Sequence, residues 1–155
     1  MLRRFRLLKR RSDGRYTLNL GPQQRELLGS LADQLEALLD GDPDDPGLRR
    51  LFPTAYPDDI GREAEWQVFK GSDLRDSKRA QLEVLRAAAE RTELSEDEVG
   101  AWMQAVNGLR LVLGTRLDVS EDQVEVDPDH PEAATYALYD FLGMLLDRTV
   151  ADISR

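Results

Sequence analysis

The sequence predicts a mainly α protein, a five-helix bundle with an N-terminal β-hairpin. Apolar residues recur every three or four positions through several long segments, which is the spacing of helices that each bury one face. Near the start, Asp13-Gly14 separates two short segments of alternating apolar and polar residues, as expected of a hairpin. The length of 155 residues fits one domain, so we expect residues 1–20 (the hairpin) and 21–155 (the helices) to form a single domain.

The hairpin prediction depends on Asp13-Gly14, the favoured dipeptide of a two-residue type I′ turn. Counting outward from this turn predicts three cross-strand pairs: Leu7 with Leu20, Lys9 with Leu18, and Arg11 with Tyr16. One face of the ribbon should be apolar and pack on the helices: Phe5, Leu7, Tyr16, Leu18 and Leu20. The other face should be mostly basic: Arg4, Arg6, Leu8, Arg10, Arg15, Thr17 and Asn19.

The first helix is expected to begin at Gly21-Pro22, because proline favours the first helical position, and to end at Gly41. The leucines between these positions repeat at helical spacing, so this helix should bury one face. Residues 40–59 hold four of the seven prolines together with several aspartates. This composition predicts a connection with a single helical turn around Leu48.

The next segment is expected to form two helices. Asp58 or Asp59 can cap a short one, since aspartate is favoured at the N-cap. Gly71-Ser72-Asp73 then predicts a break before a longer helix that runs to about Ala89.

The last two helices have clear start signals. Ser95 and Glu98 have the spacing of a capping box, which predicts a strongly apolar helix from about Glu96 to Leu117. Residues 118–132 contain seven acidic residues and no basic one, and they match no calcium-loop pattern, so solvated loop charge is the favoured interpretation. Pro131 predicts the start of the final helix.

Composition excludes several classes of function. The chain has no cysteine and one histidine, which excludes disulfides, thiol nucleophiles and cysteine-ligated metal sites. It contains no phosphate loop, dinucleotide fingerprint or nucleophile elbow, so we expect no enzymatic activity, no cofactor and no metal. No run approaches the ~18 apolar residues of a membrane span, and no apolar leader follows the first basic residues. We therefore expect a cytoplasmic protein that does not bind membranes.

The hairpin is a candidate partner surface because its charge departs from that of the rest of the chain. Seven of the 21 Lys and Arg residues lie in the first fifteen positions, although the net charge is −9. The candidate contact residues are Arg4, Arg6, Arg10 and Arg15. Such a ribbon can meet an acidic protein surface, and a solvated outer face is an equally good interpretation. Binding of DNA is the weaker alternative, because no aromatic residue lies on this face to stack on bases.

A second candidate site is Arg110, which interrupts the apolar stripe of the helix expected over residues 96–117. A buried guanidinium must be paired. It can clamp a carboxylate or another anion, which would make the chain a small-molecule anion-binding protein or a small enzyme. The favoured alternative is an internal ion pair, for example with Asp140, or a side chain that reaches past the stripe to solvent.

Two segments resemble the signature of an actinobacterial family catalogued as domain of unknown function 2017 and associated with the oxidative-stress regulator AosR. The first is LRRLFP from Leu48, followed by AYPDD from Ala55. The second is Trp102 followed by VNGLRLVLGTRL from Val106. The candidate residues of the signature helix are Trp102, Asn107, Arg110 and Arg116, and those of the signature loop are Tyr56, Asp58 and Asp59. Asn107, Arg110 and Arg116 are expected to hold the signature helix in place.

The resemblance implies a cytoplasmic regulatory protein that works through a protein partner such as RNA polymerase or a stress sigma factor, and it implies no known active site. We therefore expect a non-enzymatic interaction protein with a transcription-associated role in the oxidative-stress response. The hairpin and the connection at 40–59 are its expected contact surfaces, and a homodimer is left open. Without cysteine, the sulfur chemistry of this chain is limited to oxidation of Met1, Met103 or Met144.

Overall fold

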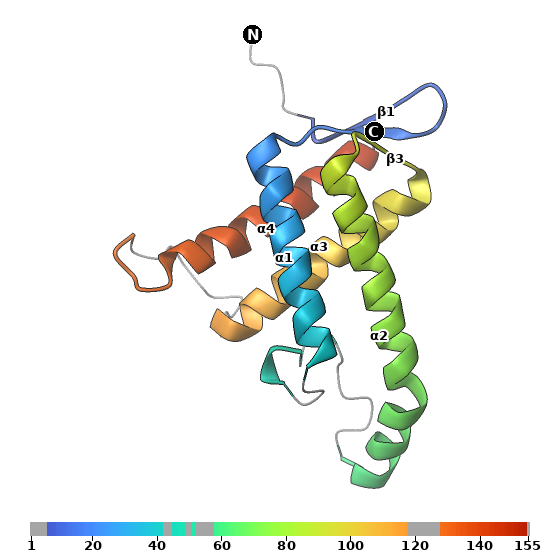
Figure 1. The fold of residues 1–155 in the computed structure, drawn as a ribbon, viewed down its shortest axis with the longest axis vertical. Helices are drawn as coiled ribbons and strands as arrows, with labels where there is room; N and C mark the ends of the chain where they lie inside the picture. The colour runs from blue at the N-terminus through green and yellow to red at the C-terminus, as the bar shows by residue number, and fades with distance from the viewer. Residues whose placement is uncertain (1–5, 42–44, 49–50, 52–57, 118–127, 155) are drawn as a thin grey trace.

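The computed structural model describes residues 6–41, 45–48, 51, 58–117 and 128–154. Its helices and strands, in chain order, are β1 (Leu8–Arg10), β2 (Tyr16–Leu18), α1 (Pro22–Asp40), the 3-10 helix η1 (Pro46–Leu48), α2 (Ile60–Glu90), β3 (Glu93–Leu94), α3 (Glu96–Leu117) and α4 (Ala133–Ile153) (Figure 1). The predicted mainly α fold with an N-terminal hairpin is confirmed, and the five helices of the described residues are four α-helices and the 3-10 helix.

The helices pack in chain order, with α1 on α2, α2 on α3 and α3 on α4. Figure 1 shows α1 and α2 running alongside each other, while α3 and α4 cross them, and the small sheet lies at the end of the molecule where α4 terminates. The core between them is built mainly from leucine and from one fully buried tryptophan, Trp102. Because each helix presents an apolar stripe to its neighbour, burial of these side chains is the main driving force for the bundle.

The hairpin differs from the prediction by one residue in register. Its observed cross-strand pairs are Leu8 with Leu18, Lys9 with Thr17, and Arg10 with Tyr16. The cause is the turn, in which the Gly14 N–H donates to the Arg11 carbonyl oxygen at 3.1 Å and Gly14 adopts a φ of 84°. Ser12 and Asp13 therefore form the centre of the turn and Gly14 follows it, which is a three-residue loop rather than a two-residue type I′ turn.

This register also corrects the predicted faces of the hairpin. Cross-strand partners lie on the same face, so Arg10 shares a face with Tyr16 instead of opposing it. Leu8, expected among the basic residues, is buried together with Leu7. The hairpin is also not the whole sheet, because β3 pairs with β2 on its other side and makes β2 the central strand.

The predicted break at Gly71-Ser72-Asp73 is wrong, because α2 is continuous from Ile60 to Glu90. Its start was predicted correctly, since the Asp59 side chain accepts a hydrogen bond from the Arg62 N–H at 3.1 Å. One glycine inside a helix costs about 1 kcal/mol. Ending the helix would instead leave several backbone N–H and C=O groups without partners at two new termini.

The other helix predictions are confirmed to within two residues. α1 begins at Pro22 and ends one residue before Gly41, and α3 spans the residues expected from the capping box. α4 begins at Ala133, two residues after the predicted proline start. Across the described ranges, none of these helices combines the length and apolar character needed to cross a membrane.

Arg25 of α1 connects the sheet to the end of α2. Its guanidinium donates to the carbonyl oxygens of Leu18 and Leu20 at 2.9 and 3.0 Å. It also donates to the carbonyl oxygens of Ala88 and Arg91 at 2.7 and 2.6 Å. Because the last carbonyls of a helix lack partners within it, Arg25 supplies donors where α2 terminates and anchors β2 there.

Asp152, near the end of α4, connects the sheet to the C-terminal helix. Its carboxylate is buried and accepts hydrogen bonds from the backbone N–H groups of Leu7 and Leu8, at 2.8 and 3.1 Å. Since β1 is an edge strand, this carboxylate occupies backbone donors that another strand could otherwise use. The hairpin is therefore attached to α1, α2 and α4.

Candidate functional site

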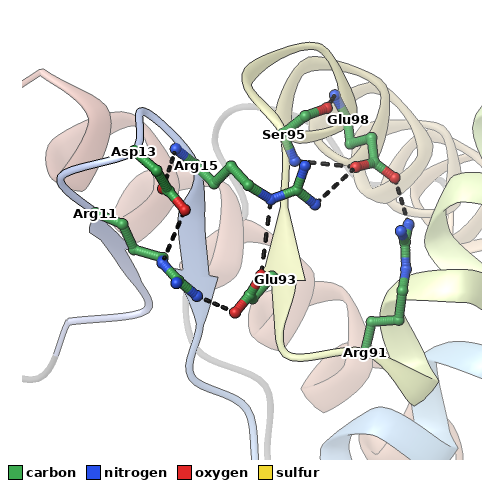
Figure 2. A network of polar contacts seen from close by, with 7 residues as sticks. All are labelled: Arg11, Asp13, Arg15, Arg91, Glu93, Ser95 and Glu98. Carbon is green, nitrogen blue, oxygen red and sulfur yellow. Dashed lines mark hydrogen bonds and ion pairs between the residues drawn. The ribbon is translucent and has the colours of Figure 1, made fainter.

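The hairpin end of the molecule carries a network of charges (Figure 2). Arg11 forms an ion pair with Glu93 of β3. Arg15 reaches both acids, with its Nε 3.7 Å from Glu93 and its Nη2 3.9 Å from Glu98 at the start of α3. Arg91, directly after α2, also pairs with Glu98. Two glutamates therefore hold three arginines, and the network joins the hairpin to the beginning of α3.

Glu98 is tied to its own helix terminus as well. Its carboxylate accepts a hydrogen bond from the Ser95 N–H at 3.0 Å, and Ser95 Oγ accepts one from the Glu98 N–H at 3.2 Å, which confirms the predicted capping box. The backbone hydrogen bond from Ser95, followed by the hydrogen bond from Arg91, lowers the pKa of Glu98 below its usual value of 4.5. Glu98 is therefore charged at neutral pH.

The network changes which hairpin cations are available to a partner. Arg15, expected at the partner surface, is engaged with acids of its own chain. In contrast, Arg6, Lys9 and Arg10 are exposed and form no ion pair within the part of the chain that the structure describes. We call these three residues the β1 cations. Lys9 was missed from the sequence because its role depends on the register, and Arg4 lies outside the described residues.

Arg110 lies between α3 and α4. Its guanidinium carbon is 4.7 Å from the centre of the Tyr139 ring, the geometry of a cation–π contact. Its Nε is buried and has no hydrogen-bond partner among the described residues. The ion pair with Asp140, one of the alternatives for this residue, is not formed within the described part of the chain. The ring stabilises the charge instead, without occupying the N–H donors.

A pocket of about 400 Å³ lies next to Arg110. It is lined by residues of α3 and α4: Arg110, Tyr139, Asp140, Gly143, Met144, Asp147 and Arg148. The lining contains two cations and two carboxylates, so it provides both hydrogen-bond donors and acceptors. No His, Asp or Glu side chains in the described residues form a group of three or more that could hold a metal ion.

Leu48 and Leu51, two described residues of the first signature segment, lie near the second segment on α3. η1 contacts α3, and Leu48 and Leu51 are buried there. A Cβ added at Gly108 of α3 would lie 3.4 Å from Leu51 Cδ2, so the absence of a side chain lets the two segments approach closely. Leu48, Leu51 and Gly108 are therefore explained by packing of η1 and Leu51 against α3.

The individual signature residues differ in their surroundings. Trp102 is fully buried in the core, and its Nε1 has no hydrogen-bond partner among the described residues. Asn107 is exposed and forms no hydrogen bond with a described residue, so it does not hold α3 against another described element. Asp58 and Asp59 are both exposed at the start of α2. Tyr56 and the side chain of Arg116 lie outside the described residues.

Comparison with known proteins gives the same family as the two signature segments. The chain matches the family described as "Domain of unknown function (DUF2017)" over residues 2–152. It is 30% identical over 190 residues to proteins named "Oxidative stress regulator AosR" in Mycobacterium bovis and Mycobacterium tuberculosis, an alignment that covers 97% of this chain and 87% of each relative. No solved structure matches the chain. From the extent of these matches, the chain belongs to the DUF2017 family.

Proposed function

We propose that this chain is a non-enzymatic regulator of the oxidative-stress response that acts by binding an acidic surface of a protein partner. The regulatory part of the proposal is supported by the names of its mycobacterial relatives. The partner class that follows from the family resemblance is the transcription machinery, RNA polymerase or a stress sigma factor, and the proposed location is the cytoplasm.

The single observation that supports this binding surface is a difference in ion pairing among the hairpin cations. Arg11 and Arg15 are paired with Glu93 and Glu98, whereas the β1 cations are exposed and unpaired within the described residues. Exposed like charges close together in one strand increase the rate of encounter with an oppositely charged surface. The hairpin is also attached to three helices, so it presents these cations in a fixed arrangement.

The proposal is tested by charge reversal in Arg6→Glu/Arg10→Glu. The matched control is Arg62→Glu/Arg75→Glu, which changes the net charge equally but in the first half of α2, a segment that lies away from the sheet (Figure 1). Both variants and the unaltered protein are immobilised and used to capture partners from a lysate of the source cells, and captured proteins are then purified and titrated.

We expect the hairpin variant to keep its melting temperature and lose the partner, while the control retains it. The titration should show an affinity that falls as salt rises, because the contact is electrostatic. Equal capture by the two variants would contradict the proposal, and capture of DNA alone would assign the β1 cations to nucleic acid instead.

Arg110 supports a second candidate function, binding of a small anion, because its guanidinium has no carboxylate partner among the described residues. The carboxylates of Asp140 and Asp147 in the same pocket oppose an anion there. A thermal-shift titration with acetate and phosphate tests this function, since a ligand at 100 times its Kd stabilises by ~2.7 kcal/mol. An unchanged melting temperature counts against it.

A further inference from the structure

The sulfur atoms of this chain are confined to three methionines, because it has no cysteine. Met1 lies outside the described residues, and Met103 is partly buried and packed against the hydrophobic core. Met144 of α4 is different, with 39% of its surface exposed. Since oxidation of methionine depends on access of the oxidant to sulfur, Met144 is the more reactive of the two described methionines.

Met144 is also distinguished by its surroundings. It lines the pocket between α3 and α4 together with Arg110 and Arg148. Arg148 is one helical turn after Met144 on α4, so the two side chains lie on the same face of that helix. Arg110 reaches the same pocket from α3. The exposed thioether of Met144 therefore shares this pocket with one guanidinium from α3 and one from α4.

Arg110 forms no hydrogen bond with a described residue. Its Nε has no hydrogen-bond partner among the described residues, and its only charge-stabilising contact in the described chain is the Tyr139 ring. Gly143, directly before Met144, makes room for this guanidinium, because an added Cβ would lie 3.4 Å from Arg110 Nε. A buried donor without an acceptor is unfavourable, so an acceptor oxygen that enters the pocket gains a strong, charge-assisted hydrogen bond.

We propose that Met144 is the oxidant-reactive methionine among the described residues and that Arg110 donates a hydrogen bond to the oxygen of its sulfoxide. The relevance of this reaction to stress regulation rests on the proposed function, but the chemistry does not. A sulfur lone pair attacks one oxygen of hydrogen peroxide, the O–O bond breaks, and the second oxygen leaves as water after proton transfer. The thioether is oxidised by two electrons to the sulfoxide, and the peroxide is reduced to water.

The consequence is local to the contact between α3 and α4. A thioether is a weak acceptor, whereas a sulfoxide carries a polar oxygen that accepts strongly. Oxidation thus replaces an apolar side chain at the pocket with one that bonds to the neighbouring helix. A methionine sulfoxide reductase can reverse the change.

The first experiment measures where oxygen is added. The purified protein is treated with hydrogen peroxide, and peptide mass spectrometry follows the gain of one oxygen atom at each methionine with time. We expect Met144 to react severalfold faster than Met103, which serves as the internal control. Equal rates at the two methionines would overturn the proposal.

The second experiment tests the role of Arg110 through the change in melting temperature on oxidation. It compares the unaltered protein with Arg110→Leu, with Arg148→Leu as the matched control from the same pocket. Oxidation should lower the melting temperature more in Arg110→Leu than in the unaltered protein, because the sulfoxide then lacks its donor. The Arg148→Leu variant should respond as the unaltered protein does. An equal response of all three chains, or a larger one in Arg148→Leu alone, would overturn the assignment of Arg110.

A third variant keeps the test decisive if Arg110→Leu does not fold. Met144→Leu should abolish the oxidation-dependent change in melting temperature, and a change that persists in it would show that another methionine is responsible. All these measurements use the isolated protein. Failure of the oxidation proposal is therefore distinguishable from failure of partner binding, which is tested at the β1 cations.

Discussion

Two contacts in the molecule use an arginine in opposite ways. One is the contact between the sheet and the helices, and the other is the contact between α3 and α4. Arg25 donates hydrogen bonds to four backbone carbonyl oxygens, two in the strand region and two at the end of α2. Arg110 donates none to any described residue and lies over the Tyr139 ring. Arg25 thus joins backbone segments, whereas Arg110 has no hydrogen-bond acceptor among the described residues.

The difference follows from where each guanidinium lies relative to helix termini. Arg25 reaches the C-terminal end of α2, where Ala88 and Arg91 have carbonyl oxygens that no later turn of the helix can use. Arg110 lies in the middle of α3 and faces the middle of α4, where the backbone carbonyls are already bonded within the helices. An arginine between two helix interiors therefore has only side chains, water or a ligand as partners.

The largest effect is expected from Arg25→Leu. This change removes four hydrogen bonds to carbonyl oxygens and leaves those at the end of α2 and around β2 without donors. We expect the free energy of unfolding to fall by about 3 kcal/mol, measured by urea unfolding. Arg25→Lys keeps the charge but lacks the planar fork, so it should recover part of the loss. A loss of stability in Arg25→Leu as small as that in Arg110→Leu would contradict the difference between the two arginines.

A somewhat smaller effect is expected from Asp152→Leu. The N–H groups of Leu7 and Leu8 lose their acceptor at a buried position. Unfolding by urea should show a loss of about 2 kcal/mol. Asp152→Asn retains one acceptor oxygen and should lose less stability. If Asp152→Asn is less stable than Asp152→Leu, the hydrogen bonds to Leu7 and Leu8 are not the source of the stabilisation.

A smaller loss of stability is expected from Arg110→Leu. The substitution removes a cation–π contact and no hydrogen bond to a described residue. The expected loss of unfolding free energy is less than about 1 kcal/mol. A Tyr139→Leu variant should lose a similar contact from the opposite partner, and a cycle with the double variant measures the coupling between the two side chains. A loss of several kcal/mol in Arg110→Leu would show that its donors are not free.

The smallest effect is expected from the network in Figure 2, because its members are partly exposed to solvent. The folded-state pKa of Glu98 is lowered, so its stabilising contribution is present above the usual value of 4.5 and is lost as the pH falls through the folded-state pKa. Glu98→Gln should therefore be less stable than the unaltered protein at neutral pH. The gap in urea midpoint should close in acid, and a gap that is constant with pH would contradict this assignment.

Features that depend on residues close in sequence could be predicted. The capping box of Ser95 and Glu98 and the cap at Asp59 involve groups three residues apart, and both were found as expected. The hairpin register failed because Asp13-Gly14 is compatible with both a two-residue and a three-residue turn. A difference of one residue in the loop moves every cross-strand pair.

Features that depend on distant residues could not be predicted. β3 is only two residues long, and it pairs with β2 although α1 and α2 lie between the two strands in the sequence. Arg25 and Arg91 lie next to each other only after α1 and α2 have packed. The role of Met144 required the pocket, since its helical spacing alone is that of any amphipathic helix. The sequence therefore indicated a basic hairpin, but it could not show which of the hairpin cations form ion pairs within the chain.

The hydrogen bonds between Asp152 and the first strand have a consequence for the order of folding. The two partners are 145 positions apart in the chain, so one edge of the sheet is closed by almost the last described residue. During synthesis, α1 and α2 can pack as soon as both have emerged, but the hairpin keeps an open edge until α4 arrives. Closing so long a loop is entropically costly, and the contacts between α4 and the hairpin that offset this cost form only late in folding. A chain that is cut before Asp152 therefore exposes an unprotected strand, which makes the C-terminal turn of α4 a safeguard against aggregation.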